Sequence, residues 1–450
     1  MFNLGHGSGG DVVLSSESHL LILGPPRCGK TRSVVIPNLK SLGVATVVTS
    51  TKEDIIGDTI GARKEMGDVY IFDPLESVRD LKGANRLYFS PISAIDTFDD
   101  AMMMAHAMFG ASLTASRGGQ VNFWEERAEA VISSILLAAK VAPTHLSMDF
   151  VMETIEGRNF DHALAILESQ GQSEAFRTLS SVALAAPKEQ SGIASTASSI
   201  LSAYRSPSVL NQERQANFDP KGFVRSCDTI YVVAPAAQQQ IVAPVVLGLM
   251  QAVKGASYEW ARDRSIRDET FVPKPNVALL LDEMANIAPL RDLASILSEG
   301  ASQGVLVMGV LQDLSQARHR WGSESDGFIT LFGNVAIFPG IADSKTLRDL
   351  SLLGGEDVVT LRSRSSRRSL LAPPSVTYSE HFHPRVTPSE IFATPRDEIL
   401  LFSGNGGFTR VMRRRDEISP NISRSQEMEV MEVKDDATRS RRRGPILGRW

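Results

Sequence analysis

The sequence predicts an α/β fold: a mostly parallel central sheet with an all-helical insertion. Short β-rich runs alternate with helical segments near the N-terminus and again after about residue 218. Between these regions alanine, methionine, serine and leucine dominate, and β-branched runs become rare. A glycine-rich loop also joins the first apolar run to a helical pattern, which is typical of phosphate-binding α/β sheets. Together these observations predict one sheet assembled from two separated parts of the chain.

Residues 1–94 are predicted to form the first part of the sheet domain. His19–Leu23, Val44–Thr49 and Val69–Phe72 are apolar runs of the length and composition of buried strands. Lys30–Ser41 has the pattern of a helix between the first two. Strand, helix, strand is the order found in parallel α/β units.

Residues 95–217 are predicted to form the all-α insertion. Apolar residues recur at helical spacing in four segments, Trp124–Val141, Met148–Ile155, Phe160–Leu167 and Ile193–Tyr204. We interpret Trp124 as a core residue of its helix and not as a base-stacking residue, because a tryptophan on an apolar helix is more often buried.

Residues 218–408 are predicted to complete the sheet, and residues 409–450 to form a charged, disordered tail. The strands expected in this part are Thr229–Val233, Val277–Leu281, Val305–Leu311, Val335–Phe338 and Glu398–Phe402. In the tail, basic Arg413–Arg415, acidic Glu427–Asp436 and basic Arg439–Arg443 follow one another with few apolar anchors. A free tail is favoured over a contact of the last block with DNA or acidic lipid.

The composition excludes several classes of protein. Among 450 residues, 42% are apolar and 22% charged, which is typical of a globular protein. A net charge of −5 and a pI of about 6.0 exclude a uniformly basic DNA-coating surface.

Two cysteines, Cys28 and Cys227, indicate no disulfide framework and favour a reducing compartment. Met1–Asp11 is no signal peptide, and the most apolar helical stretch, Ala128–Val141, is shorter than the roughly 20 residues of a membrane span. We therefore expect no transmembrane segment.

A complete G-x-x-x-x-G-K-[ST] motif predicts a phosphate-binding loop. Its glycines allow the backbone to wrap around phosphates, so that N–H groups and the helix N-terminus face the negative charge. Lys30 is expected to reach the β- and γ-phosphates of ATP, and the Thr31 hydroxyl to bind Mg²⁺. The predicted cofactor-binding residues are Gly24, Pro25, Pro26, Arg27, Cys28, Gly29, Lys30 and Thr31.

An acidic pair after a buried strand supplies the second half of this site. Val277–Leu281 is followed directly by Asp282 and Glu283, and ligands bind at the carboxyl ends of strands in such sheets. Asp282 is expected to hold the Mg²⁺ shell, and Glu283 to orient and deprotonate the attacking water. Gln312, at the end of the next strand, is a candidate sensor of the γ-phosphate; a structural bond to backbone is the alternative.

Several motifs in order resemble the TraG/TraD-like type IV coupling proteins. Leu279–Gly322 resembles that family's second ATPase motif, and Phe72-Asp73-Pro74, the Trp124 helix and Arg385–Ile391 resemble family landmarks at matching places. The resemblance extends from about Leu21 to Gly404. It implies a RecA-like nucleotide-binding domain with an all-α domain that helps select substrate. It also implies a homohexamer that uses ATP and Mg²⁺ to pass DNA, a relaxase–DNA complex or another secreted substrate to the secretion channel at the inner membrane.

The chain departs from the family pattern in three places. It begins almost at the first strand, where members carry transmembrane helices, which leaves open a membrane-free variant or a late-started reading frame. We expect a cytoplasmic location with attachment to the inner membrane through partners. The family's D-x-K-G-E motif corresponds here to Ser50-Thr51-Lys52-Glu53-Asp54. Of the motif's defined residues, only the lysine is kept, as Lys52. No arginine stands near Ala301–Ser302 to complete a neighbouring subunit's site; the substitutes left open are Arg318, Arg320 and Arg348.

Two other functions remain open. An FtsK/HerA-like double-stranded DNA translocase would share the loop and the acidic pair, but the large helical insertion favours the coupling family. A substrate adaptor that binds nucleotide without hydrolysing it would explain the missing arginine, but the full set of site residues argues against it.

Among lesser candidates, His381 and His383 lack further ligands for zinc. The arginines of the Arg362–Ser369 stretch, Arg362, Arg364, Arg367 and Arg368, fit a DNA-lining loop and a solvated loop equally well.

Overall fold

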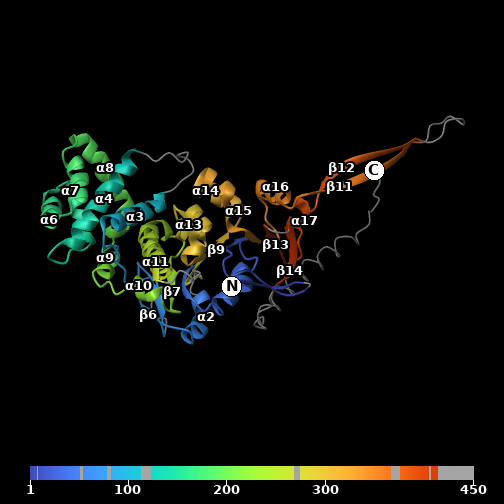
Figure 1. Ribbon diagram of the computed structural model, residues 1–450, viewed down its shortest axis with the longest axis horizontal. Helices are drawn as coiled ribbons and strands as arrows, with labels where there is room; N and C mark the ends of the chain where they lie inside the picture. The colour runs from blue at the N-terminus through green and yellow to red at the C-terminus, as the bar shows by residue number, and fades with distance from the viewer. Residues whose placement is uncertain are drawn as a thin grey trace, which may run out of the picture.

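A computed structural model describes residues 1–7, 9–50, 54–78, 83–112, 123–267, 274–365, 375–404 and 407–413. A single 12-stranded sheet runs through the molecule in the order β2-β1-β14-β13-β10-β3-β9-β8-β4-β7-β5-β6. The predicted fold class is confirmed: the strands from β10 to β6 are parallel, and helices cover both faces. The insertion helices lie at one end of the long axis (Figure 1).

The parallel strands match the apolar runs of the sequence closely, because strands covered on both faces consist of continuous apolar residues. Every residue of the strands around the site, β3, β4, β8 and β9, is buried. The bounds of the parallel strands are Leu20–Leu23 (β3), Ala45–Ser50 (β4), Val69–Phe72 (β5), Asn85–Arg86 (β6), Thr229–Val233 (β7), Val277–Leu281 (β8), Val305–Leu311 (β9) and Asn334–Ile337 (β10).

Successive residues of the central strands face two separate cores. In β8, Leu279 and Leu281 pack into one core, while Ala278 and Leu280 pack into the other. The first core holds α11 (Gln239–Arg267), α12 (Met284–Ile287), α13 (Leu293–Glu299) and α15 (Phe328–Phe332). The second holds a π-helical turn, η1 (Thr31–Val35), with α1 (Ile36–Leu39) and α2 (Asp54–Lys64). The single helix predicted for Lys30–Ser41 is thus a π-helical turn followed by a short α-helix.

Between β6 and β7 the described chain is helical. Its helices are α3 (Phe98–Met108), α4 (Phe123–Val141), α5 (Met148–Gly157), α6 (Asp161–Ser169), α7 (Ser173–Ala183), α8 (Pro187–Ile200), α9 (Pro207–Glu213) and α10 (Pro220–Phe223). The buried helix α4 contacts α3, α5, α6, α7 and α8, and α3 also contacts α11 beneath the sheet. Trp124 packs against Gly192 so closely that a Cβ there would lie 2.7 Å from the ring, consistent with a packing role.

The helix α11 is the one helix in the described ranges that is long and apolar enough to cross a membrane. The sequence pattern had indicated Ala128–Val141 as the most apolar helical stretch, but α11 is longer. In the fold, 83% of its most apolar window is buried, so α11 has the environment of a core helix.

The antiparallel edge of the sheet was not fully predicted. Only β13 (Glu398–Ser403) was expected; β1 (Asn3–Gly7), β2 (Gly10–Val13) and β14 (Gly407–Met412) add to it. The predicted tail boundary at residue 409 is therefore wrong, because β14 pairs with β13 through Met412. Residues 414–450 lie outside the described residues.

The serine- and arginine-rich stretch is not a loop at its start. Glu356–Ser365 (β11) pairs with Ser375–Pro384 (β12) in a two-stranded ribbon that projects from the body opposite the insertion (Figure 1). Arg362 and Arg364 lie on β11, and His381 and His383 lie on β12. Arg367 and Arg368 fall outside the described residues. The remaining helices are α14 (Leu314–Trp321), α16 (Ser344–Leu353) and α17 (Pro388–Phe392).

An ion pair joins the insertion to the sheet domain. Glu129 of α4 accepts a hydrogen bond from Arg291 at 2.5 Å and lies 3.1 Å from Nδ1 of His106, and the Glu129 and Arg291 side chains are only 20% and 15% exposed. Burial raises the pKa of Glu129, but the hydrogen bond with His106 and the charge of Arg291 lower it by more. The pKa of Glu129 is therefore below its usual value.

We predict that Glu129→Gln destabilises the protein by about 1–2 kcal/mol near neutral pH, because Arg291 then loses its partner. Because the pKa of Glu129 is lower in the folded state, its ionised carboxylate stabilises the fold at pH values above the unfolded pKa of about 4.3. This stabilisation is lost as the pH falls through the pKa of the folded state. The difference from wild type should therefore shrink at acidic pH. Urea unfolding at several pH values measures it. Glu126→Gln, on the exposed face of the same helix, is the matched control; an equal loss in both variants would contradict the assignment.

Candidate functional site

The predicted phosphate loop connects β3 to η1 and is held by the neighbouring strand ends. The N–H of Gly24 donates to the carbonyl oxygens of Leu311 and Gln312, at 3.3 and 3.1 Å, which ties the start of the loop to the end of β9. A Cβ on Gly24 would lie 2.6 Å from Cβ of Phe338, so only glycine fits there. The loop is thus seated between β9 and the residue that follows β10.

The far end of the loop turns directly into the helix. Gly29 has a φ of +93° and Arg27 a φ of +61°, both in the left-handed region that reverses the chain locally. The N–H of Ser33 then donates to the carbonyl of Gly29 at 2.9 Å. Since the first N–H groups of a helix have no partners within it, this end of the loop provides donors for an anion.

Lys30 lies over the loop that contains it. Its ammonium donates to the carbonyl oxygens of Gly24 at 2.5 Å and Pro25 at 3.0 Å. The positive charge therefore lies among the residues of the phosphate loop. Its contact with the β- and γ-phosphates stays a prediction.

Asp282 brings the second motif to the first. Its carboxylate accepts a hydrogen bond from the Thr31 hydroxyl at 3.4 Å, although the two residues are 251 positions apart. The Thr49 hydroxyl donates to the Asp282 carbonyl at 2.7 Å and fixes the end of β8 against β4. A threonine hydroxyl and a carboxylate side by side are the oxygen ligands that Mg²⁺ takes together with phosphate and water.

The electrostatics of Asp282 suit a cation. Burial and the neighbouring carboxylate of Glu283 raise the pKa of Asp282 to about 6, and the charge of Lys30 offsets only part of this effect. A bound divalent ion would reverse the balance by favouring the ionised form. No group of three His, Cys, Asp or Glu side chains that could hold a metal occurs in the described part of the chain.

Glu283 occupies a strained backbone conformation. Its φ of 55° and ψ of 44° are left-handed, which is uncommon for a residue with a long side chain. Its carboxylate accepts a hydrogen bond from the Asn286 side chain at 3.2 Å. Such strain is retained where the surrounding structure demands one side-chain direction, and it clusters at functional sites.

Gln312 lies between the two motifs, because β9 separates β3 from β8 in the sheet. Its carbonyl accepts from Gly24, and its N–H donates to the Gln316 side chain at 2.8 Å. The backbone of Gln312 thus fixes the loop; its role as a phosphate sensor stays a prediction.

The substitute arginines lie in different environments. Arg318 pairs with Asp343 at 2.5 Å, Arg320 donates to the carbonyl of Ala285 at 2.8 Å, and Arg348 is exposed on α16. Lys52 lies outside the described residues.

One residue next to the loop was missed by the sequence analysis. Arg413, placed there in the tail, follows β14 and stacks on the ring of Phe338. No signal in the sequence separates it from Arg414 and Arg415.

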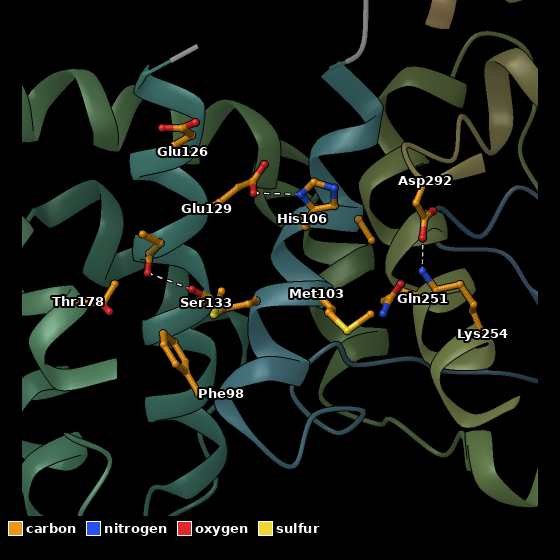
Figure 2. A pocket seen from close by; sticks show the side chains of 13 residues that line it. Phe98, Met103, His106, Glu126, Glu129, Ser133, Thr178, Gln251, Lys254 and Asp292 are labelled. Carbon is orange, nitrogen blue, oxygen red and sulfur yellow. Dashed lines mark hydrogen bonds and ion pairs between the residues drawn. The ribbon is translucent and has the colours of Figure 1, made fainter. Parts of the chain in front are cut away.

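A pocket lies elsewhere in the molecule. A cavity of about 410 Å³ opens between α3, α4 and α11, with Met103, His106, Glu129 and Lys254 at its wall (Figure 2). None of its lining residues belongs to Gly24–Thr31 or to the ends of the central strands. The phosphate loop and this cavity are therefore separate features.

The phosphate loop lies between strand β3 and a helix, and the acidic pair follows β8, which is separated from β3 by β9 alone. This arrangement defines a RecA-like P-loop nucleotide-binding fold. The family described as Type IV secretory system Conjugative DNA transfer matches residues 3–408. The chain belongs to this family, and the predicted resemblance is confirmed.

Similar proteins include VirD4 of Rhizobium rhizogenes, 22% identical over 88% of this chain and 58% of the relative. A TraG conjugal transfer protein of Escherichia coli is 23% identical over 85% of this chain and 62% of the relative. The chain thus spans about three fifths of the length of these relatives.

Solved structures of the coupling protein TrwB share the fold. The complex of TrwB with ADP and Mg²⁺ superimposes with a TM-score of 0.65 at 18% identity, over 90% of this chain and 87% of TrwB. The unbound form of TrwB gives the same TM-score at 17% identity.

We predict that Asp282→Asn stabilises the nucleotide-free, magnesium-free protein by about 1–2 kcal/mol near pH 8. Because the folded pKa of Asp282, about 6, lies above the ordinary aspartate pKa of 3.8, the stability of the wild-type protein falls as pH rises through about 6. Asparagine carries no such charge. Thermal unfolding in the presence of chelator measures the difference, which should shrink toward about pH 4. Equal stability of the two proteins near pH 8 would contradict this account of the carboxylate.

Proposed function

We propose that this chain is the ATP-hydrolysing motor region of a type IV coupling protein, which recruits DNA or a relaxase–DNA complex and moves it to the secretion channel. The observation that carries the proposal is the contact between Thr31 and Asp282 at 3.4 Å. It joins the phosphate loop to the acidic strand end, and each motif alone would be insufficient for hydrolysis.

The residues divide the reaction among them. The loop Gly24–Thr31 binds the phosphates of ATP, and Lys30 moves from its backbone carbonyls to the β- and γ-phosphates. Thr31 and Asp282 would hold Mg²⁺, which would supply positive charge against the phosphates. Glu283 orients and deprotonates the attacking water, and its left-handed backbone supports this by fixing the side-chain direction. Gln312 senses the γ-phosphate from the intervening strand.

The relatives support the reaction and the substrate. TrwB has been solved with ADP and Mg²⁺ and with non-hydrolysable nucleotide analogues. The TraG relative is a conjugal transfer protein, and the family is one of conjugative DNA transfer. We extend these properties to this chain, with DNA and a secreted nucleoprotein as substrates.

The assembly is proposed to be a homohexamer with ATP at subunit interfaces, on the cytoplasmic face of the inner membrane. One of Arg318, Arg320 and Arg348 would complete a neighbouring site. Arg348 is the most available, because it is exposed and bonds only weakly to Ser344, at 3.4 Å.

We predict that Lys30→Ala loses nucleotide affinity, whereas Glu283→Gln binds ATP normally and hydrolyses it at least about 100-fold more slowly, since only the base is removed. Binding is measured with a fluorescent ATP analogue and turnover by phosphate release. Wild-type turnover in Glu283→Gln would exclude the proposed base.

We also predict that ATP turnover per subunit rises with protein concentration and with added DNA, because the sites form between subunits. The assay uses the purified chain with and without single- and double-stranded DNA. Stimulation by double-stranded DNA alone would favour a translocase of the FtsK/HerA kind. Nucleotide binding without turnover under every condition would favour the adaptor.

A further inference from the structure

Arg413 stands over the phosphate loop although it comes from the far, antiparallel edge of the sheet. Its backbone N–H donates to the carbonyl of Asp397 at 2.9 Å, which fixes the chain just after β14. Its guanidinium carbon lies 4.5 Å from the centre of the Phe338 ring. Its Nη1 lies 3.2 Å from the place that a Cβ on Gly29 would occupy. The side chain therefore reaches the end of the loop at which the helix begins.

Arg413 forms no ion pair among the described residues, although the charge of Asp397 partly opposes the lowering of its pKa by burial. Its Nε is buried without a hydrogen bond there, and burial lowers the pKa of the guanidinium. Arg291 and Arg318, which are also partly buried, pair with carboxylates. The fully buried Arg63 is held instead by carbonyl and hydroxyl oxygens. A half-buried guanidinium whose Nε has no hydrogen bond is costly unless a ligand from outside the fold satisfies it.

The charges of two cations reach Cys28 in the middle of the loop. The charges of Lys30 and Arg413 both act on the Cys28 thiol, partly opposing the burial that raises its pKa. Lys30 bonds to the first two residues of the loop, and Arg413 lies against Gly29. An anion in the loop would therefore meet two positive charges.

We propose that Arg413 is a second cationic contact of the bound nucleotide and binds its phosphate chain together with Lys30. This inference rests on the proposed function, because it requires ATP in the loop. The ring of Phe338 holds the guanidinium, so its planar set of donors is ready for phosphate oxygens. Phe338 also fills the space against Gly24, so one buried ring positions both the loop and the arginine.

In this arrangement β14, the last strand in the described chain, places the residue after it at the nucleotide site. The parallel strands supply the loop and the acidic pair, whereas β14 brings Arg413 from a part of the chain more than a hundred residues beyond Asp282. Binding of nucleotide would thus tie the antiparallel edge to the catalytic centre.

The test measures binding of Mg·ATP and of inorganic triphosphate to the full chain by calorimetry. Arg413→Ala should weaken both ligands about 10- to 100-fold, the range expected for loss of a charge-assisted hydrogen bond. Arg413→Lys should recover part of the loss. Arg410→Ala is the matched control, because Arg410 lies on the same strand, is 56% exposed and pairs with Glu398 at 2.8 Å; it should bind both ligands like wild type.

Binding of both ligands by Arg413→Ala within about 2-fold of wild type would overturn the proposal. Weaker ATP binding with unchanged triphosphate binding would assign Arg413 to the base or ribose and would also overturn it. If wild type binds neither ligand, the proposed function fails as well. Arg413→Gln, with thermal unfolding as a check, preserves the packing on Phe338 and separates loss of charge from loss of fold.

Discussion

The contact between Thr31 and Asp282 depends on the adjacency of three buried strands. β3 carries the loop, β8 carries the acidic pair, and β9 lies between them and binds the loop through the carbonyls of Leu311 and Gln312. Parallel strands end at one edge, so residues from distant parts of the sequence meet there. Everything inserted between β3 and β8 has to leave and rejoin the sheet without disturbing this spacing.

The helical insertion meets this requirement by being anchored at its base. It departs after β6 at the sheet edge and returns at β7, two strands inside that edge. The helix α3 packs on α11, and the pair formed by Glu129 and Arg291 joins α4 to the segment between α12 and α13. This segment follows Glu283 by fewer than ten residues, so the insertion contacts the chain immediately after the acidic pair. A movement of the insertion would therefore be transmitted through this short segment to the acidic pair, and a movement of the acidic pair to the insertion.

The sequence predicted those elements whose physics is local. Strands such as β8 and β9 are continuous apolar runs because both their faces are buried, and the phosphate loop has a motif because its chemistry requires specific residues in order. β1, with Gly5 and Gly7, and the polar ribbon β11–β12 lack that signal, since their pairing depends on partners far along the chain. The helix α11 contains Pro244, which usually argues against a long helix. Arg413 could not be identified, because only the fold brings the end of β14 to the loop.

The pairing of β1 with β14 also bears on how this protein is made. His6 faces Met412 across the two strands, so β1 can form this pairing only after the much later β14 has left the ribosome. β3 likewise pairs with β9 and β10, both about 300 residues later. Contacts of such long range slow folding and leave strand edges open during synthesis. The nascent chain would therefore carry unpaired, strongly apolar strands through most of translation, and the insertion, whose contacts are local, is the part best suited to fold first.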